Sequence, residues 1–482
     1  MKNLNVKTFL VILGLFFISF FLFSNLIIGN KSFQYLKSLI SSDTKELIKT
    51  YIFPYYKISQ QEDNHKKEIL EKQELISSLK MQIYQQHNSS DFLAIELLIK
   101  KNRDDIKTSE SILTLSNNKI LKKYNLSSGF YSGILNKTPG SGYIDFHQGN
   151  IIVLSSRGVL AFKKNIENTK ENFKQIKNNI SQFIGLNQFS KQSYNDLYHW
   201  FSLKDLHVHQ NKIFISYTEE IKEDCWNTSL IFGDMNYENI KFKKLFSSKD
   251  CIHSIDNIDK TFNAHQSGGR IITLNDKHVL LSIGDYRSRF LTQDVNSVNG
   301  KIIKVNIENS QYEIISMGHR NPQGLYFDVE NNVIFETEHG PRGGDEINLI
   351  EVSKISKEKI QNYGWPISSY GEHYEGRAVF NKTLYEKYPL YKSHSEHGFI
   401  EPLKAFVPSI GISEIVKVGT NKYVVSSMVD KSLYFFELSK QKKIINVERV
   451  EVYERVRDLK FNNNQLFLFI ENSASIGVLN FN

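Results

Sequence analysis

The chain has 482 residues, of which 40% are hydrophobic and 12% aromatic, enough for one large folded domain and an additional segment. Its 33 Phe and 24 Tyr outnumber its 3 Trp, a composition that favours strands. The formal net charge is +8, but the lysines are scattered and no stripe of Lys and Arg interleaves with aromatic residues, which argues against a nucleic-acid partner.

The first predicted element is an apolar helix. Residues 9–28 form a run of 20 residues without a charge, long enough to cross a bilayer. Lys2 and Lys7 precede this run, which predicts a cytoplasmic N-terminus and a main domain on the periplasmic or other outer side of the cytoplasmic membrane. A cleaved signal peptide is the alternative, but the run is longer than a usual signal and no A-x-A-like site follows it. We therefore expect residues 1–31 to form an uncleaved, single-pass transmembrane anchor.

Residues 32–108 form the second predicted segment, which is polar, rich in Lys, Gln and Glu, and helical in pattern. Ile69, Ile76 and Ile83 recur every seventh residue, as in a two-stranded coiled coil. The heptads are few and Lys72 falls at a core position, so a helical stalk is favoured over a helix that makes a dimer.

From residue 109 onward, short β-like runs alternate with turn residues. Many short strands of this kind predict an all-β sandwich, barrel or propeller. Residues 166–191 interrupt the pattern as a helical or irregular insertion. The expected strands include 142–146, 150–155, 158–162, 212–217, 230–232, 270–274, 278–283, 301–305, 324–329, 332–337, 422–426, 432–438 and 465–470.

The chain has two cysteines, Cys225 and Cys251. In an oxidising compartment they would be able to pair, and two unrelated thiols are the alternative. Their spacing fits neither a zinc site nor a C-x-x-C redox motif.

A histidine precedes a glycine pair in the run AHQSGGR at 264–270, where an expected strand begins. At such a position His265 can present its imidazole to a cavity, and the ordinary pKa of histidine suits a general base. An ordinary loop histidine is the alternative. Asp285 follows the expected strand at 278–283, and a carboxylate beside a histidine fixes its tautomer and makes it a better base.

Polar residues and glycines are concentrated between residues 318 and 366 (GHRNPQGLYFDVENNVIFETEHGPRGGDEINLIEVSKISKEKIQNYGWP). They fall at the ends of expected strands and in the loops beyond, where a scaffold displays functional groups. The acidic pair Asp345-Glu346, beside the Gly340-Pro341 carbonyls, suits a hard cation such as calcium. A solvated loop is the alternative, but this density of glycines and paired charges argues against it.

Near the C-terminus, Arg455 and Arg457 are two residues apart in an expected strand, so their side chains face the same side. Such a pair suits a ligand with two carboxylates. A charged edge strand is the alternative.

Three parts of the 318–366 stretch resemble the signature of the glucose/sorbosone dehydrogenases, soluble quinoproteins that oxidise aldose sugars with pyrroloquinoline quinone (PQQ). G-x-R-N-x-Q-G stands at 318–324, E-H-G-P-x-G-G-D-E-x-N at 338–348, and N-Y-G-W-P at 362–366. Four further segments are similar to family motifs: AHQSGGR to H-x-x-G-R, Gly284-Asp285 to G-D, RVRD at 455–458 to R-x-R-D, and PSIG at 408–411 to P-S-I-A/G. The resemblance extends weakly over about residues 130–482. It implies that residues 109–482 form a six-bladed β-propeller.

The resemblance also implies catalytic roles. His265 would take the proton of the sugar C1 hydroxyl while hydride passes to PQQ, with Asp285 orienting the imidazole. Arg320 would stabilise the oxyanion that develops on the quinone. The residues implied to hold PQQ, a tricarboxylate, are Arg320, Asn321, Arg455 and Arg457.

Calcium is the second implied cofactor. The backbone carbonyls of Gly340 and Pro341 would hold the calcium ion that polarises PQQ, next to the acidic Asp345. Glu346 and Tyr363 match a second, structural calcium site in part of the family.

Two segments depart from the family pattern. Val429 stands where some members have a lysine that contacts the cofactor, and Lys431 would replace it only if the loop shifts. Around Trp200 the chain lacks the glutamine and glycines of a G-Q-x-G-L-L-G-like run.

The leading expectation is a membrane-anchored dehydrogenase that converts an aldose sugar to its lactone and passes the electrons to an unidentified acceptor. A propeller that binds a partner without catalysis is the first alternative, because one fold supports many functions. A calcium-dependent lactonase is the second.

Overall fold

The computed structural model of the chain describes residues 68, 72, 105–127, 130, 141–156, 158–184, 203–254, 256–259, 261–356, 358–374 and 379–481. The chain divides into two compact units, Met1–His87 and Asn88–Asn482. In the first unit the two described residues, Glu68 and Lys72, are helical, and the Lys72 ammonium lies 2.7 Å from the Glu68 carboxylate. The rest of the predicted stalk up to residue 104 lies outside the described residues.

The predicted single-pass membrane localisation is wrong: within the described ranges, no helix is long and apolar enough to cross a membrane. The helix α6 (Val379–Lys387) has 9 residues. At about 1.5 Å per residue it is about 14 Å long, against an apolar bilayer core of about 30 Å. Residues 9–28, on which the prediction was based, lie outside the described residues.

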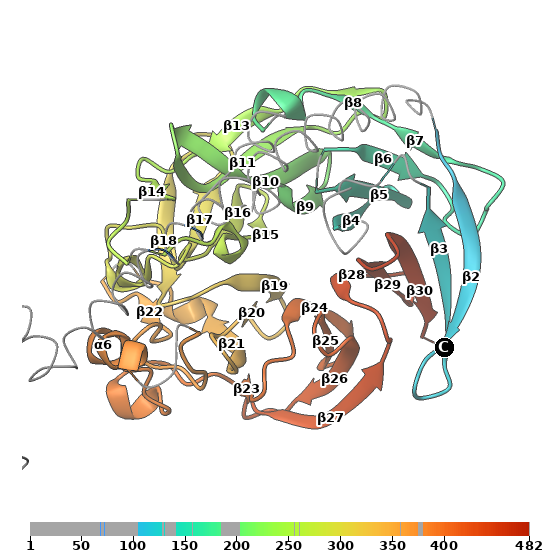
Figure 1. Cartoon of the computed structure of the whole chain (residues 1–482). Helices are drawn as coiled ribbons and strands as arrows, with labels where there is room; N and C mark the ends of the chain where they lie inside the picture. Colours follow the sequence, from blue (N-terminus) through green and yellow to red (C-terminus); the bar gives the residue numbers. More distant parts are fainter. Residues whose placement is uncertain are drawn as a thin grey trace, which may run out of the picture. The chain divides into compact units, whose positions relative to one another are not determined.

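The described part of the second unit is all-β and confirms the predicted six-bladed propeller. In Figure 1 its six sheets form a ring, and the inner strand of each sheet contacts the inner strands of its two neighbours. In chain order, the inner strands are β4 (Gly142–His147), β9 (Leu203–His209), β15 (Gly268–Asn275), β19 (Pro322–Asp328), β24 (Ile412–Gly419) and β28 (Val456–Asn462).

The remaining strands follow outward from each inner strand. The first two blades add β5 (Asn150–Ser155), β6 (Leu160–Lys163), β7 (Phe173–Gln175) and β1 (Asp105–Ile106), then β10 (Lys212–Lys222), β11 (Cys225–Asp234), β13 (Lys243–Phe246) and β14 (Ile252–His253). The third and fourth add β16 (His278–Ile283), β17 (Lys301–Asn306), β18 (Tyr312–Met317) and β22 (Gln361–Asn362), then β20 (Val333–Glu338), β21 (Asp345–Glu351) and β23 (Lys404–Phe406). The fifth adds β25 (Lys422–Ser427), β26 (Ser432–Leu438) and β27 (Ile444–Glu451).

The sixth blade joins both ends of the propeller unit. From the inner strand β28 it continues through β29 (Gln465–Ile470) and β30 (Ser475–Asn480) to β3 (Ile120–Leu126) and β2 (Thr108–Thr114). The antiparallel register sets Lys122 opposite Val478. This pairing gives β30 a partner on its outer side, so the ring closes without an exposed edge there.

Local sequence explains several strand boundaries. The strands expected at 150–155, 278–283, 432–438 and 465–470 have those limits in the structure. Between β4 and β5, Gln148 and Gly149 have φ of 48° and 79°, the positive values that a two-residue hairpin turn requires. The expected insertion at 166–191 contains, where described, β7, the short strand β8 (Lys177–Asn178) paired with β12 (Asn239–Ile240), and the 3₁₀ turn η2 (Ile180–Gln182).

A buried charge cluster joins four inner strands. The Arg270 Nη1 atom of β15 lies 2.8 Å from Asp205, 2.7 Å from Glu414 and 2.8 Å from Asp458, which come from β9, β24 and β28. Burial raises the pKa of Glu414 to about 8 and that of Asp205 to about 6, although Arg270 opposes both shifts. One guanidinium therefore holds three carboxylates in the interior of the ring.

Cys225 and Cys251 form a disulfide with a Cα–Cα distance of 5.2 Å, which settles the two alternatives in favour of pairing. It ties β11 to the segment that leads into β14.

The bridged residues are 26 apart in sequence. A loop of this length predicts that the double substitution C225A/C251A lowers the free energy of unfolding by about 2–4 kcal/mol, measured by urea denaturation. The double variant, which has no cysteine, should unfold identically with and without reductant, and a wild-type protein insensitive to reductant would contradict the prediction.

Candidate active site

The sequence-predicted site residues lie at one end of the blades. His265 precedes the start of β15, Asp285 follows the end of β16, and Arg320 precedes the start of β19. A backbone hydrogen bond connects the loops of two neighbouring blades: Asp285 N donates to Arg320 O at 2.9 Å. Arg457 belongs to the start of β28, and its carbonyl accepts from the Ser413 hydroxyl at the start of β24. The strands thus bring residues as far apart in the sequence as His265 and Arg457, which are 192 positions apart, to one end of the ring.

His265 lies in the 3₁₀ turn η4 (Ala264–Gln266), and its side chain is exposed. Asn263 caps this turn by accepting from His265 N at 2.8 Å. The Tyr286 N–H donates to Gln266 O at 3.0 Å, so the loop of His265 is paired with the loop of Asp285. An exposed imidazole on an anchored turn is accessible to a substrate.

Asp285 is fully buried and is a hydrogen-bond acceptor for other groups of the site. Its carboxylate accepts from Trp365 Nε1 and from Arg287 N, each at 2.8 Å. Burial raises the pKa of Asp285, while Arg320 opposes the shift. The carboxylate therefore fixes the indole of the N-Y-G-W-P segment, and its predicted action on His265 stays a prediction.

Gln266 connects Asp285 to Arg320 and was not predicted from the sequence. Its amide orientation is assigned from its hydrogen-bond partners. The nitrogen donates to Asp285 Oδ1 at 2.9 Å, and the oxygen accepts from Arg320 Nη2 at 2.9 Å and Arg287 Nε at 3.3 Å. The position of Gln266 next to the candidate base was the one signal that the sequence offered. No local pattern predicts which residues this glutamine contacts.

Arg320 is buried and held on three sides. Its Nη1 donates to the carbonyls of His339 at 2.8 Å and Gly340 at 2.5 Å. The guanidinium lies 5.4 Å from the Trp365 ring centroid and 5.7 Å from that of Tyr374, within cation–π range. Burial lowers the pKa of Arg320. These contacts fix the orientation of one cation in a desolvated site, as charge stabilisation requires.

Asn321 and Gln323 connect the loop of His265 to Arg457 of the last blade. Asn321 Oδ1 accepts from Gly268 N at 3.2 Å and from Gln323 Nε2 at 3.1 Å. Gln323 Oε1 in turn accepts from Arg457 Nη1 at 3.3 Å. These hydrogen bonds join two of the four predicted cofactor-binding residues, Asn321 and Arg457, to the loop of His265, and Arg320 is joined to that loop separately through Gln266.

Arg455 and Arg457 share one carboxylate, although Arg455 directly precedes β28 and only Arg457 lies within it. Glu471 Oε2 accepts from Arg455 Nε at 2.8 Å, and Oε1 accepts from Arg457 Nη2 at 2.8 Å. Glu471 is buried, and the two arginines lower its pKa to about 2 against the effect of burial. Glu471 was not predicted from the sequence, although a glutamate directly after the largely apolar run QLFLFI is an unusual feature.

The second predicted calcium site does not fit the structure. His394 lies between its two residues, with Nδ1 2.8 Å from Tyr363 O and Nε2 3.4 Å from Glu346 Oε1. The Tyr363 hydroxyl donates to Leu349 O at 2.7 Å. The His394 imidazole thus pairs with the Tyr363 carbonyl and the Glu346 carboxylate in the place that a calcium ion would take.

The first predicted calcium site is partly consistent with the structure. Asp345 cannot readily serve it, because its carboxylate accepts from the backbone amides of Gly340, Gly411 and Ile412 at 2.7–3.1 Å. The Gly340 carbonyl accepts from Arg320 but has a second lone pair. A calcium ion on the Gly340 and Pro341 carbonyls therefore stays a prediction.

The site gathers several guanidinium groups that would suit an anionic cofactor. Its carboxylates already accept hydrogen bonds: Asp285 and Glu471 from side chains of the site, and Glu338 and Asp345, at the same end of the blades, from backbone N–H groups. The nearby cations Arg287 and Arg289 contribute to the lowered pKa of Arg320, a sign of repulsion between guanidinium groups. The guanidinium groups at this end of the blades are Arg287, Arg320, Arg455 and Arg457. A tricarboxylate such as PQQ would relieve this repulsion.

Of the two departures from the family pattern, one is described. Val429 is 64% exposed, and its N–H donates to Ile410 O at 3.0 Å. Lys431 is exposed, with φ of 56°. Trp200 and the segment around it lie outside the described residues.

Comparisons with known proteins agree with this geometry. The family model for glucose/sorbosone dehydrogenases matches residues 202–479. The aldose sugar dehydrogenase YliI of Escherichia coli is 27% identical over 181 residues, 34% of this chain and 44% of that protein. The quinoprotein glucose dehydrogenase B of Acinetobacter calcoaceticus is 31% identical over 132 residues, 21% of this chain and 26% of that protein. The chain spans half or less of the length of the curated relatives that it matches.

Among solved structures, the PQQ-bound form of an aldose sugar dehydrogenase from Streptomyces coelicolor superimposes with a TM-score of 0.52 at 16% identity. The match covers 78% of this chain and 99% of that one. At this identity the likeness shows the fold alone, which is the propeller described above.

Proposed function

Because the chain belongs to the glucose/sorbosone dehydrogenase family, we propose that it oxidises an aldose sugar to the corresponding lactone with PQQ as its cofactor. The observation that carries this proposal is the gathering of Arg320, Arg455 and Arg457 at one end of the propeller, next to an exposed histidine. The relatives named above act on aldose sugars or are quinoproteins, which supports the same reaction class here.

The residues of the chain would divide the work between binding and proton transfer. Arg455 and Arg457, on their shared Glu471, would bind carboxylates of the cofactor, with Asn321 positioned beside them through Gln323. PQQ, when bound, supplies the two-electron acceptor for the oxidation. His265 would accept the proton of the sugar C1 hydroxyl, since its imidazole is exposed beside this site.

Arg320 would act as a fixed positive charge in the site. Its guanidinium is held by two carbonyls and two aromatic rings, so no reorganisation is needed when negative charge develops nearby. The Trp365 indole is itself fixed by Asp285. Electrons must leave for an external acceptor, which we do not identify.

We expect the purified full-length chain to bind PQQ saturably in a spectroscopic titration with calcium present. Removal of a charge-assisted contact is worth about 1.5–3 kcal/mol, so Arg320→Ala and Arg455→Ala should each weaken binding by about 10- to 100-fold. Arg449→Ala is the control, because Arg449 pairs with Asp430 on the surface at 2.8 Å. Absence of binding at micromolar PQQ would reject the proposal and leave the non-catalytic propeller as the better account.

A further inference from the structure

A second group of chemically active side chains adjoins the proposed cofactor site without being part of it. It consists of His319, in the loop after β18, and Glu336 and Glu338 on β20, and we call it the His319 cluster. The two glutamates are two residues apart on a strand, so they project from the same face. The side chains of all three are at most 4% exposed.

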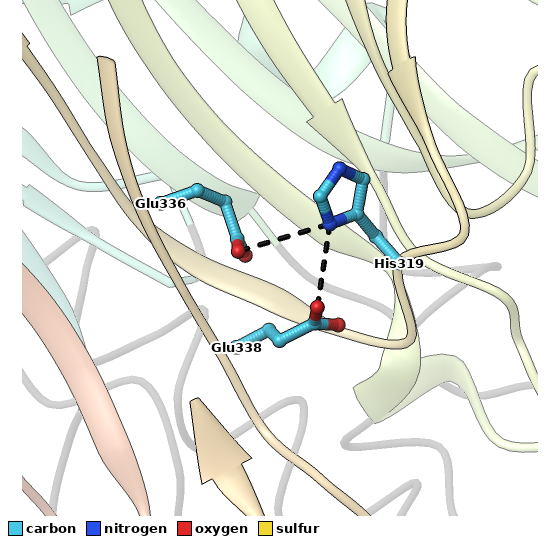
Figure 2. Close-up of side chains that lie close together, drawn as sticks. All are labelled: His319, Glu336 and Glu338. Atoms are coloured by element: carbon cyan, nitrogen blue, oxygen red, sulfur yellow. Dashed lines mark hydrogen bonds and ion pairs between the residues drawn. The ribbon is translucent and has the colours of Figure 1, made fainter. Parts of the chain in front are cut away.

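One ring nitrogen of His319 faces both carboxylates, and Figure 2 shows the two contacts meeting at this atom. His319 Nδ1 lies 3.3 Å from Glu338 Oε1 and 3.7 Å from Glu336 Oε2. One ligand atom from each residue lies within 4.8 Å of the other two. Ligand atoms about 2.0–2.2 Å from a tetrahedral zinc ion lie about 3.3–3.6 Å from one another, so the spacing suits a metal ion.

The other ring nitrogen of His319 is also placed as in metal sites. Nε2 lies 2.9 Å from the Ser316 hydroxyl, which can accept its N–H. That tautomer directs the lone pair of Nδ1 toward the two carboxylates. Metal-binding histidines commonly have such a second partner on the far nitrogen, which fixes the ring and its tautomer.

The acidic groups of the cluster are poorly compensated by the protein. Asn348 Nδ2, with two hydrogens, faces three carboxylates: Glu336 at 3.0 Å, Glu338 at 3.1 Å and Glu346 at 3.4 Å. In the described residues, Glu336 Oε1 and Asn348 Oδ1 are fully buried oxygens without a hydrogen-bond partner. Burying such groups without a partner costs several kcal/mol, more when they are charged.

We propose that the His319 cluster is a structural binding site for a divalent transition-metal ion, with zinc as the best match. One imidazole nitrogen and two carboxylate oxygens suit zinc or manganese better than calcium, whose ligands are oxygens alone. The Glu336 Oε1 and Asn348 Oδ1 atoms are available as further metal ligands. This site does not depend on the proposed oxidation of sugars.

The ion would connect the cluster to the proposed active site. His319 directly precedes Arg320, and the Arg320 backbone N–H donates to Glu338 Oε2. The ring of Tyr363, from the N-Y-G-W-P segment, stacks on His319 at 4.8 Å between centroids. A metal ion would therefore tie the loop of Arg320 to β20.

The test uses the full-length chain after dialysis against a chelator. We expect one equivalent of Zn²⁺ to bind in isothermal titration and to raise the melting temperature. Co²⁺ should give visible absorption bands typical of a nitrogen and oxygen ligand set. Glu336→Gln, which keeps the shape and removes the charge, should weaken Zn²⁺ binding by at least about 100-fold. Glu330→Gln is the matched control, because Glu330 lies in the exposed turn at the other end of the same hairpin.

Three results would overturn the proposal. The first is binding of less than about one fifth of an equivalent, and the second is equal binding by wild type and Glu336→Gln, which would place the metal elsewhere. The third is a metal-free Glu336→Gln protein with a higher melting temperature than the wild type, together with a wild-type melting temperature that Zn²⁺ does not change. A proton shared by the carboxylates would then account for the cluster. If Glu336→Gln does not fold, Glu336→Asp retains the charge but withdraws the carboxylate, and the same readouts apply.

Discussion

The variant His265→Gln is expected to lower kcat for aldose oxidation by about 10²- to 10⁴-fold, the contribution of a positioned general base. Glutamine can hydrogen-bond to the sugar but cannot accept its proton. The turn that carries residue 265 should persist, because Asn263 caps it through the backbone N–H and not through the imidazole. PQQ affinity should stay within about twofold of the wild-type value, since the arginines that would bind the cofactor belong to other loops.

The matched control for this prediction is His278→Gln. His278 begins β16, at the opposite end of the β15–β16 hairpin from Gly268 and Ile283. It therefore belongs to the same blade but lies away from the site. Steady-state rates with an artificial electron acceptor measure both variants. If His265→Gln retained more than about one tenth of the wild-type kcat, His265 would not be the base and the surrounding loop would need another candidate.

The second large effect concerns stability. Replacing Arg270 by methionine removes the cation that three buried carboxylates share, and we expect the free energy of unfolding to fall by about 3–5 kcal/mol. Methionine fills a similar volume, so the loss reports the uncompensated charge more than a cavity. Urea denaturation at pH 7 measures it. Arg449→Met is the control, and it should cost no more than about 1 kcal/mol because Arg449 is 43% exposed.

The pH dependence of this loss separates charge from packing. The pKa of Glu414 is raised to about 8 and that of Asp205 to about 6, above their ordinary values. The folded protein therefore holds protons that the unfolded chain has released, and this source of stability is lost as the pH rises through those values. Without Arg270 the carboxyls should hold protons more tightly still. The destabilisation should be larger at pH 8 than at pH 5.5, and an equal loss at both would indicate a packing defect.

Part of the candidate site could be predicted from sequence motifs. The residues around His265, Arg320 and Asn321 were expected at strand ends and in the loops beyond them, and they lie there, because glycines and paired charges mark where strands stop. The same-face prediction for Arg455 and Arg457 assumed that both lie in one strand; β28 begins at Val456, so Arg455 lies just before it, and the two side chains nevertheless share Glu471. The prediction for Glu346 and Tyr363 does not fit, because His394, more than 30 residues further on, takes the position between them.

The sequence alone determined the properties that depend on near neighbours: the all-β class, the limits of strands such as 278–283 and 465–470, and the loops that carry chemistry. Alternation of side chains and turn residues act within a few positions, so they can be read locally. The blade number came from family resemblance, since no repeat is visible. Only the tertiary structure decided the closure of the sixth blade, where Lys122 lies opposite Val478, and the meeting of His319 with Glu336 and Glu338. These contacts join distant positions, and their energy depends on burial and distances that exist only once the ring has closed.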